Sequence, residues 1–345
     1  MAELTGFQAR GSHVWLLAPT QSQIVERARQ AGVAVQSLNV SKLRWPLNAI
    51  LLARWFMRQR IEILNTHSSR DGWLAAVAGR IARVPLIIRT RHIDVDYPNR
   101  WISRHAFTTL ADHILTTSEK IKRRFQDMFQ LPSERITVVP TGIDLTQFSP
   151  DGPKAQFSGS PPGTLPLVGM VSVLRSWKGH PIFLRAIQIL TAANFPARYV
   201  IVGEGPQRSQ IESRIRDLHF DSIVSLAGHR EDVPEVLRAL NVLVMPSTDH
   251  EGIPQAGLQA LATKTPVIGS DIGGIPEIIK PDQTGRLVPA GNPEALAAAI
   301  RDALSDQQTT KRFASAGREL VERHYSLESM LDKVEAVYRR HLGNA

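Results

Sequence analysis

Glu251 stands immediately before a short turn, Gly252, Ile253 and Pro254, which leads into a helix-like segment of small and apolar residues. Proline suits a first helical turn because its missing N–H would be unpaired there in any case, so we expect the helix to begin between Gly252 and Gln255. The backbone amides of Gln255 and Ala256 would then be unpaired and would attract an anion such as phosphate. Glu251 would repel that anion unless its carboxylate faces neutral hydroxyl groups beside it, as in a sugar attached to a diphosphate. The alternative is that Glu251 only complements the helix dipole, which is worth about 0.3 to 1 kcal/mol.

Two basic residues, Arg175 and Lys178, follow the apolar run 167–174 at a transition from strand to helix. Two cations at such a position can neutralise a departing diphosphate without a metal ion. A lone basic pair in a loop is more often simply solvated, but its place at a strand end in the same half of the chain as Glu251 favours binding. The loop of Gly228, His229 and Arg230 follows another strand, and we expect backbone contacts there to help select the sugar and the base.

Two histidines in the first half of the chain, His67 and His92, each follow an apolar run that reads as a strand. A lone histidine is more often structural than catalytic, but sites in parallel α/β domains lie at the carboxyl ends of strands. The Asp94–Asp96 pair could suggest a metal-dependent nucleotide-sugar enzyme, although so short a match is frequent by chance. We therefore predict no metal site. The basic run 120–125 is most simply a solvated helix face, and a contact with phosphate or lipid is the second interpretation.

Several classes of protein are disfavoured by the sequence. The chain of 345 residues contains no G-x-G-x-x-G after a strand and no P-loop motif. No apolar run is long enough to cross a membrane, and the best candidate, 47–60, carries three arginines and reads as an amphipathic surface helix. We expect no secretory leader, because the sequence shows no basic, apolar, small-residue leader pattern, and the absence of cysteine fits a cytosolic location.

The net charge of +9 comes entirely from the first half of the chain. Residues 1–150 contain 20 Lys and Arg against 11 Asp and Glu, whereas residues 151–345 contain 21 of each class. This excess would draw the first half toward an anionic membrane surface or a phosphorylated acceptor. A solvated basic face without a partner is the equally weighted alternative, and a nucleic-acid partner is not expected.

Apolar β-branched runs alternate with helical patterns on both sides of residues 149–166, where 11 of the 18 residues are Pro, Gly or Ser. This alternation predicts two Rossmann-like, doubly wound parallel-sheet domains that face each other across a cleft. The expected division is an N-terminal acceptor-binding domain at 1–148, a linker at 149–166, a nucleotide-sugar-binding domain at 167–325, and an amphipathic helix at 326–345 that packs back toward the N-terminal domain. The first residues read as the end of a helix closed by Gly11, so the first strand of the N-terminal domain and its glycine-rich turn are expected to be missing.

In this order and spacing, the segments resemble retaining glycosyltransferases of family 4, which have the GT-B fold. The resemblance is carried by VVPTGIDLTQFSP, VSVLRSWKGH, VIVGEGPQ, LAGHREDVPEVLRALNVLVMPS, EGIPQAGLQALATKTPVIGSDIGGIPEII and GRLVPAGNPEAL. It implies that Glu251 binds the hydroxyls of the donor sugar, and that Arg175 and Lys178 hold the diphosphate with the amides near Gln255. It also implies that His92 approaches the transferred sugar. Where the family has a second Glu that binds ribose, this chain has Gln259, which weakens or retunes that contact.

The predicted function is transfer of a sugar, with retention, from a nucleotide diphosphate sugar to a cell-envelope glycolipid or polysaccharide. The nucleotide sugar is a co-substrate, and no cofactor or metal is expected. The predicted location is cytoplasmic, with peripheral contact to the inner face of the plasma membrane. Two alternatives remain at this point: a non-catalytic nucleotide-sugar-binding subunit of the same fold, and a nucleotide-sugar epimerase.

Overall fold

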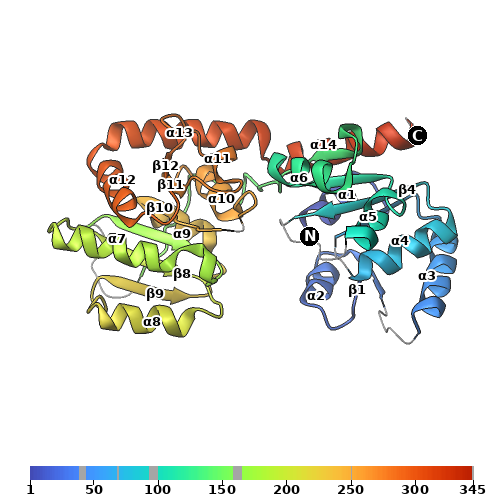
Figure 1. Ribbon diagram of the computed structural model, residues 1–345, viewed down its shortest axis with the longest axis horizontal. Coiled ribbons are helices and arrows are strands. Elements are labelled where there is room, and N and C mark those ends of the chain that lie inside the picture. Colours follow the sequence, from blue (N-terminus) through green and yellow to red (C-terminus); the bar gives the residue numbers. More distant parts are fainter. Residues whose placement is uncertain (39–43, 68–69, 93–99, 158–164, 250, 344–345) are drawn as a thin grey trace. The chain divides into compact units, whose positions relative to one another are not determined.

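The computed structural model describes residues 1–343 apart from 39–43, 68–69, 93–99, 158–164 and 250. The Asp94–Asp96 pair and part of the expected linker therefore lie outside the described residues. The chain forms two compact units: unit 1 comprises Met1–Gly142 and Leu327–Ala345, and unit 2 comprises Ile143–Ser326. Each unit is described by itself below (Figure 1).

Unit 1 contains two parallel sheets in its described residues. β1 (Trp15–Ala18) pairs with β2 (Ala34–Ser37), and a second sheet has the order β3-β4-β5-β6. The strands of the second sheet are β3 (Ile63–Thr66), β4 (Leu86–Arg91), β5 (His113–Thr116) and β6 (Ile136–Val138). Every residue of β4 is buried, as expected for a central parallel strand with helices on both faces.

Most helices of unit 1 divide between the two faces of the β3–β6 sheet, whereas the second helix contacts β1 and β2. They are α1 (Ala2–Ala9), α2 (Gln23–Gln30), α3 (Trp45–Gln59), α4 (Arg70–Ala82), α5 (Arg100–Thr108), α6 (Glu119–Phe129) and α14 (Leu327–Leu342). Leu64 and Ile87 pack in a cluster with α3 and α4, and Ile114 and Ile136 pack with α5 and α6. On the other face, Leu86 and Ile88 pack with α1 and α14.

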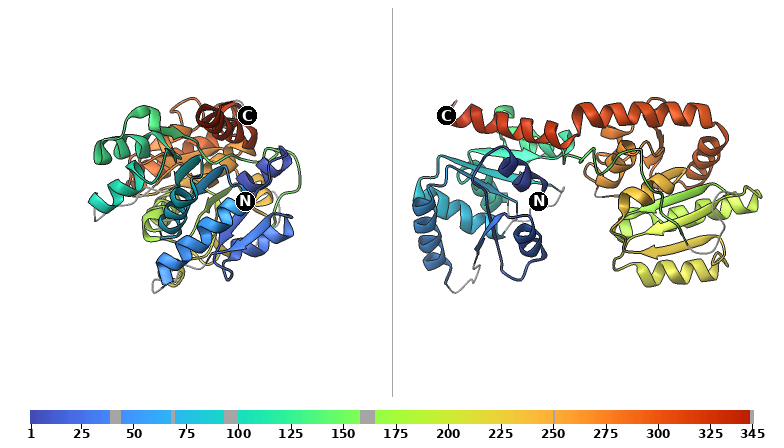
Figure 2. Two further views of the ribbon diagram at one scale, coloured as in Figure 1. Left: turned by 90° about the vertical axis from the view of Figure 1, so that its right-hand side faces the viewer. Right: turned by 180° about the vertical axis from the view of Figure 1, so that it is seen from behind.

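The first and fourteenth helices lie side by side in unit 1 (Figure 2). α1 ends as predicted, because Gly11 adopts a positive φ of 87° and its amide donates to the carbonyl of Gln8. Next to this turn, the Arg10 guanidinium contacts three carboxylates of α14, those of Glu328, Asp332 and Glu335, at 2.7, 2.7 and 2.6 Å. Ion pairs and apolar contacts thus hold α1 and α14, which lie far apart in the sequence, together in unit 1.

Unit 2 has one parallel sheet of six strands in the order β12-β11-β10-β7-β8-β9. The strands are β7 (Leu167–Val171), β8 (Arg198–Val202), β9 (Val224–Gly228), β10 (Val242–Met245), β11 (Val267–Ser270) and β12 (Arg286–Val288). The helices are α7 (His180–Ala192), α8 (Arg208–Asp217), α9 (Val233–Ala239), α10 (Gln255–Ala262), α11 (Ile275–Ile278), α12 (Pro293–Ser305) and α13 (Gln307–His324). The parallel α/β sheets of the predicted fold class are confirmed.

Alternate residues of the unit 2 strands point to two separate cores. Val168 and Ile201 pack in one cluster with residues of α7, α8 and α12, whereas Val200 and Leu243 pack in the other with residues of α9, α10, α11 and α13. This alternation is what a sheet covered by helices on both faces requires. Among the helices in the described part of the chain, none combines the length and the apolar character needed to cross a membrane.

Candidate functional site

The side on which successive strands are added to the unit 2 sheet changes at β7. From β7 the next two strands, β8 and β9, are added on one side, and β10 then lies on the other side of β7. The loops that follow β7 and β10 therefore leave the same edge of the sheet in opposite directions, and ligands of doubly wound sheets bind at this switch point. The loop after β7 carries Arg175 and Lys178, and the loop after β10 carries Glu251.

Lys178 and Glu251 contact each other at this point. The Lys178 Nζ lies 2.5 Å from Oε1 of Glu251, and the Ser247 hydroxyl donates to the same oxygen at 2.6 Å. The Glu251 side chain is 6% exposed and that of Lys178 is 22% exposed. Among the described residues, both of these hydrogen bonds go to Oε1, and none is found to the second carboxylate oxygen, Oε2 of Glu251. A carboxylate held by one oxygen keeps the other for a hydroxyl donor.

The two loops are fixed to each other by backbone contacts. The Thr248 amide donates to the carbonyl of Trp177 at 2.8 Å. Gly179, which follows Lys178, has a φ of +79°, and a Cβ at this position would lie 1.8 Å from the carbonyl oxygen of Pro246. Only glycine permits both the left-handed backbone and this close approach. Arg175 is exposed, and its guanidinium lies over the ring of Trp177 at 5.5 Å.

A second glycine-rich turn supports the backbone of Glu251 from behind. The Gly274 amide donates to the Glu251 carbonyl at 3.2 Å. A Cβ at Gly273, whose φ is +63°, would lie 2.3 Å from that carbonyl oxygen, and a Cβ at Gly274 would lie 2.7 Å from the carbonyl carbon of Gly252. The glycines after β11 thus allow one loop to lie directly against the other.

Helix α10 begins at Gln255, as predicted, with Pro254 in extended conformation before it and no side-chain cap. Within the described part of the chain, no acceptor contacts the amides of Gln255 and Ala256. Ile253 and Gly252 are half-buried between Glu251 and the helix, and Gln259 is half-buried one turn into it. The amides, the carboxylate and the ammonium group therefore lie on neighbouring segments at one edge of the sheet.

Gly228, His229 and Arg230 lie at the same edge but at the end of β9, two strands from β7. The strands β7 and β9 are therefore roughly 10 Å apart. Arg230 forms a two-point ion pair with Asp232, one contact being 2.7 Å, and its guanidinium lies over the ring of Phe157. The hydrogen bond from Arg230 lowers the pKa of the Asp232 carboxyl. Arg230 is thus engaged within its own turn, whereas His229 is exposed.

In unit 1, His67 and His92 follow the neighbouring strands β3 and β4 and contact each other. Nδ1 of His67 lies 2.9 Å from Nε2 of His92, and the two rings are stacked with centroids 5.2 Å apart. Removal of water from the ring, followed by the nearness of His67, lowers the pKa of His92 to about 4, so this imidazole is neutral at pH 7. The sequence predicted the two strand ends, and the structure shows that they bring the rings together.

Glu3 of α1 completes this cluster and was not predicted. Its carboxylate accepts hydrogen bonds from Asn65 at 2.9 Å and from the Tyr338 hydroxyl at 3.3 Å, and it lies 3.9 Å from Nε2 of His67. Ser247 was also missed, although its position directly after a strand was a usable signal. Glu3 gave no such signal, because it lies on a helix far from both histidines in sequence.

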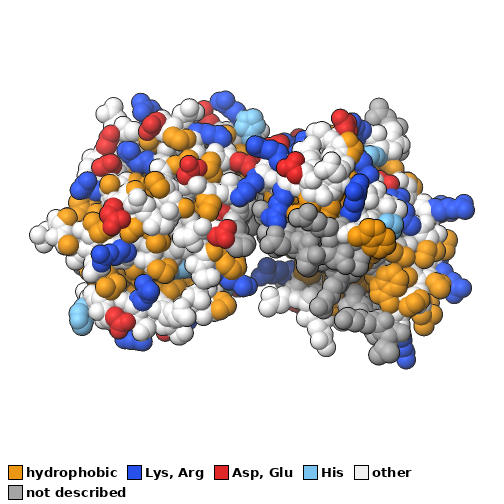
Figure 3. All heavy atoms as spheres, viewed as in Figure 1, with side chains coloured by type: hydrophobic (Ala, Val, Ile, Leu, Met, Phe, Trp, Pro, Cys, Tyr) orange, Lys and Arg blue, Asp and Glu red, His pale blue; other side chains and the backbone are white. Residues whose placement is uncertain are grey.

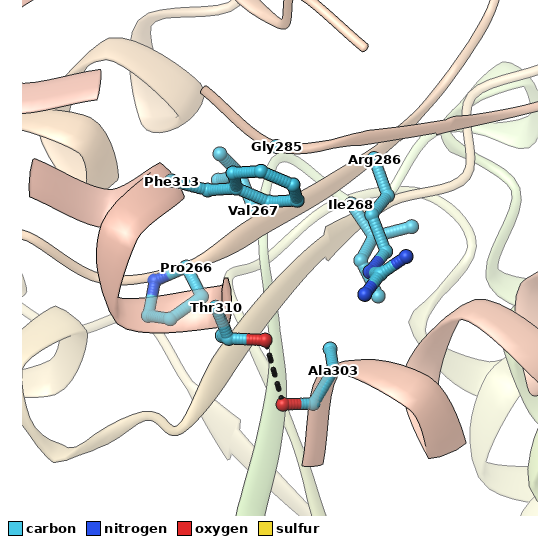
Figure 4. A pocket seen from close by; sticks show the side chains of 8 residues that line it. All are labelled: Pro266, Val267, Ile268, Gly285, Arg286, Ala303, Thr310 and Phe313. Carbon is cyan, nitrogen blue, oxygen red and sulfur yellow. Dashed lines mark hydrogen bonds between the residues drawn. The ribbon is translucent and has the colours of Figure 1, made fainter. Parts of the chain in front are cut away.

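A hollow in unit 2 is apolar and lies at the edge of its sheet opposite to the loops after β7 and β10 (Figure 4). Pro266 and Val267 at the beginning of β11 and Arg286 at the beginning of β12 line it together with residues of α12 and α13. The Thr310 hydroxyl donates to the Ala303 carbonyl at 2.9 Å across it. None of the predicted site residues lines this hollow.

Solved structures of other proteins share the fold of this chain. A glycosyltransferase from Rickettsia africae ESF-5 superposes with a TM-score of 0.88 at 20% identity, covering 100% of this chain and 94% of that one. Anabaena Alr3699/HepE, solved in complex with UDP, superposes with a TM-score of 0.83 at 17% identity, covering 98% and 96%. The chain therefore has the GT-B glycosyltransferase fold with two Rossmann-like domains.

Sequence comparisons identify the family. A model described as Glycosyltransferase Family 4 matches residues 3–147, and one described as Glycosyl transferases group 1 matches residues 152–320. The Escherichia coli UDP-Gal:alpha-D-GlcNAc-diphosphoundecaprenol alpha-1,3-galactosyltransferase is 24% identical over 335 residues, covering 93% of this chain and 86% of the relative. The putative colanic acid biosynthesis glycosyltransferase WcaL of E. coli strain K12 is 29% identical over 251 residues, 69% of this chain and 60% of the relative. The chain belongs to glycosyltransferase family 4 and is a glycosyltransferase.

Proposed function

We propose that this enzyme transfers a sugar, with retention of configuration, from a nucleotide diphosphate sugar to a lipid-linked or polysaccharide acceptor. The observation that carries the proposal is the contact of Lys178 and Ser247 with one oxygen of Glu251 at the switch point of the unit 2 sheet. The other oxygen, Oε2, is then oriented to accept a hydroxyl of the donor sugar. This arrangement would allow Glu251 to bind the donor sugar while Lys178 binds the diphosphate.

The diphosphate would be bound by Lys178, by Arg175 and by the amides of Gln255 and Ala256. These groups present positive charge where the leaving diphosphate becomes more negative in the transition state. An acceptor hydroxyl attacking the same face of the anomeric carbon would release its proton to the leaving phosphate oxygen. His92, neutral at pH 7, would contact the transferred sugar as a hydrogen-bonding group.

Gln259 would bind the ribose hydroxyls, and the loop of Gly228, His229 and Arg230 would contact the base. A carboxamide can both accept and donate hydrogen bonds to a diol, and it lacks only the charge-assisted part of the bond, about 1 kcal/mol. In the described residues no three His, Asp or Glu side chains gather as a metal site. This observation does not test whether the reaction needs a metal ion. Metal independence stays a prediction, and a chelator would test it.

The acceptor is proposed from the names of relatives. One relative is named as acting on a diphosphoundecaprenol-linked sugar, and another, from Corynebacterium glutamicum, is a monoacylated phosphatidylinositol monomannoside mannosyltransferase. The second relative is 25% identical over 333 residues. Lipid-linked acceptors would place the enzyme at the cytoplasmic face of the plasma membrane, bound peripherally.

The first test is a thermal-shift screen against UDP, GDP and ADP sugars, because a ligand that binds only the folded state raises the apparent stability. Donor hydrolysis and transfer to a lipid-linked acceptor are then measured for Glu251→Gln and Lys178→Met. Glu322→Gln is the matched control, since it removes a carboxylate paired to Arg318 at 2.6 Å elsewhere in unit 2. We expect both site variants to lose at least about 100-fold in kcat/KM, as for loss of one transition-state contact, and the control to keep its activity. A wild-type protein that is not stabilised by any nucleotide sugar would refute the proposal.

A further inference from the structure

Helix α3 of unit 1 buries one face and leaves an apolar face in water. Its buried residues are Ala49, Leu52, Ala53 and Phe56, which pack with α4 and β3. On the opposite face Leu47, Ile50, Leu51 and Met57 are 52, 46, 51 and 53% exposed. These are four of the nine large hydrophobic side chains exposed among the described residues. One helix of 15 residues therefore carries a concentrated apolar surface.

Basic residues complete this face. The segment 44–60 contains the four arginines Arg44, Arg54, Arg58 and Arg60 and no acidic residue. Arg54 lies seven residues after Leu47 and four before Arg58, so all three side chains project from the same side of the helix. In the described structure these arginines take part in no ion pair. Hydrophobic and basic side chains gather on the surface over α3 in Figure 3.

An apolar stripe beside arginines, on a helix without acidic residues, fits an anionic lipid surface. Such a helix lies in the plane of the interface, with its apolar side chains among the acyl chains and its basic side chains at the head groups. Each basic residue near an anionic leaflet favours binding, and the effect falls off within a Debye length. The 15 residues of α3 extend roughly 22 Å, so the contact spans several head groups.

A second copy of the chain fits this face less well. In a two-fold symmetric contact the same patch meets itself, so Arg54 and Arg58 of both copies would be brought together without a carboxylate on α3 to separate them. A protein partner would need a groove that is both acidic and apolar, whereas an anionic membrane surface offers both properties.

We propose that the outer face of α3, formed by Leu47, Ile50, Leu51, Arg54, Met57 and Arg58, docks the enzyme onto anionic phospholipid membranes. The buried face of the helix keeps it folded during docking, so membrane contact requires no unfolding of unit 1. The use of this surface to reach a lipid-linked acceptor rests on the proposed function, but the docking itself does not.

The test is co-sedimentation of the full chain with vesicles of phosphatidylglycerol and phosphatidylcholine, compared with phosphatidylcholine alone. We expect binding to the anionic vesicles that weakens as salt is raised from 50 to 500 mM. Leu47→Ser/Ile50→Ser/Leu51→Ser and, separately, Arg54→Glu/Arg58→Glu should each lower vesicle partitioning by about tenfold or more. The control is Lys120→Glu/Arg123→Glu on α6, which makes the same change in net charge at exposed positions of the same unit.

Three outcomes would overturn the proposal. They are equal vesicle binding by the α3 variants and the wild type, equal loss in the α6 control, or a wild-type dimer that the serine variant converts to a monomer. The thermal shift with nucleotide sugar is measured on every variant, and we expect it unchanged. It separates loss of docking from loss of the donor site and shows that each variant is folded. If the serine variant does not fold, the Arg54→Glu/Arg58→Glu variant decides the test.

Discussion

The contact between Lys178 and Glu251 can be tested by a double-mutant cycle. Glu251→Leu removes a carboxylate whose side chain is 6% exposed, and it leaves the Lys178 ammonium and the Ser247 hydroxyl without their acceptor. Removing one partner of a fully buried ion pair costs about 3 to 5 kcal/mol. The Lys178 side chain is 22% exposed and reaches water more easily, so we expect a smaller loss, about 2 to 3 kcal/mol.

Lys178→Met should cost about the same, because the more deeply buried carboxylate is then left with Ser247 as its only described donor. The double variant Lys178→Met/Glu251→Leu places two apolar side chains in contact, so we expect it to be less destabilised than the two single changes together. The expected coupling is about 1.5 to 3 kcal/mol.

Native-state hydrogen exchange of the β7 and β10 amides is the suitable assay, because it reports the opening of unit 2 alone. Additive single effects, or losses below about 0.5 kcal/mol, would show that the ion pair contributes nothing measurable. The double variant also tests whether the substrate binds at this ion pair. If it binds and turns over nucleotide sugar at the wild-type rate, the substrate does not bind at this pair.

The remaining predictions concern charge, backbone and metal. Gln259→Glu should tighten nucleotide binding by about fivefold, measured by calorimetry, because it adds a charge-assisted bond to ribose worth about 1 kcal/mol; weaker binding would contradict the ribose role. Burial is the main cause that lowers the pKa of both His113 and His180 to about 4. Since the unfolded value is about 6.5, each contributes stability that is present above pH 6.5 and is lost as pH falls toward 4, by about 2 to 3 kcal/mol. His113→Gln should flatten this dependence for unit 1 in hydrogen-exchange measurements, and an unchanged slope would argue against it. Gly274→Ala should lower both stability and donor binding, because its Cβ would meet the carbonyl carbon of Gly252 at 2.7 Å. EDTA should leave the transfer rate unchanged, and a loss that Mg²⁺ restores would show that a metal is required.

Much of the fold could be predicted from the sequence because parallel strands buried on both faces form short apolar runs. The start of α10 at Gln255 could be predicted for a similar local reason, since Pro254 and Gly252 limit where that helix can begin. β2 has no apolar run to mark it in the sequence, because two of its four residues are exposed, the other two are half-buried, and two are polar. The helix end at Gly11 was predicted correctly because a left-handed cap has a sequence signature.

The predicted site residues were found individually, but their contacts were not. Glu251 and Lys178 are far apart in the sequence, and the order of strands β7 and β10 in the sheet, which brings them together, is not written in either loop. The contact of Gly273 with Glu251 depends on how two loops pack. A glycine in the sequence can indicate a close approach or a left-handed backbone, but not which residue lies against it. Long-range contacts of this kind depend on topology, whereas helix ends and strands depend on local sequence.

Unit 1 is made from two stretches of chain, and this has a consequence during protein synthesis. Its core joins Phe7, Leu86 and Ile88 to Leu331 and Val334, so the ribosome must add residues 327–342 before that core can close. Unit 2 is a single continuous stretch, so its core needs no residue beyond Ser326. The unit whose synthesis begins first is thus the one whose core is completed last.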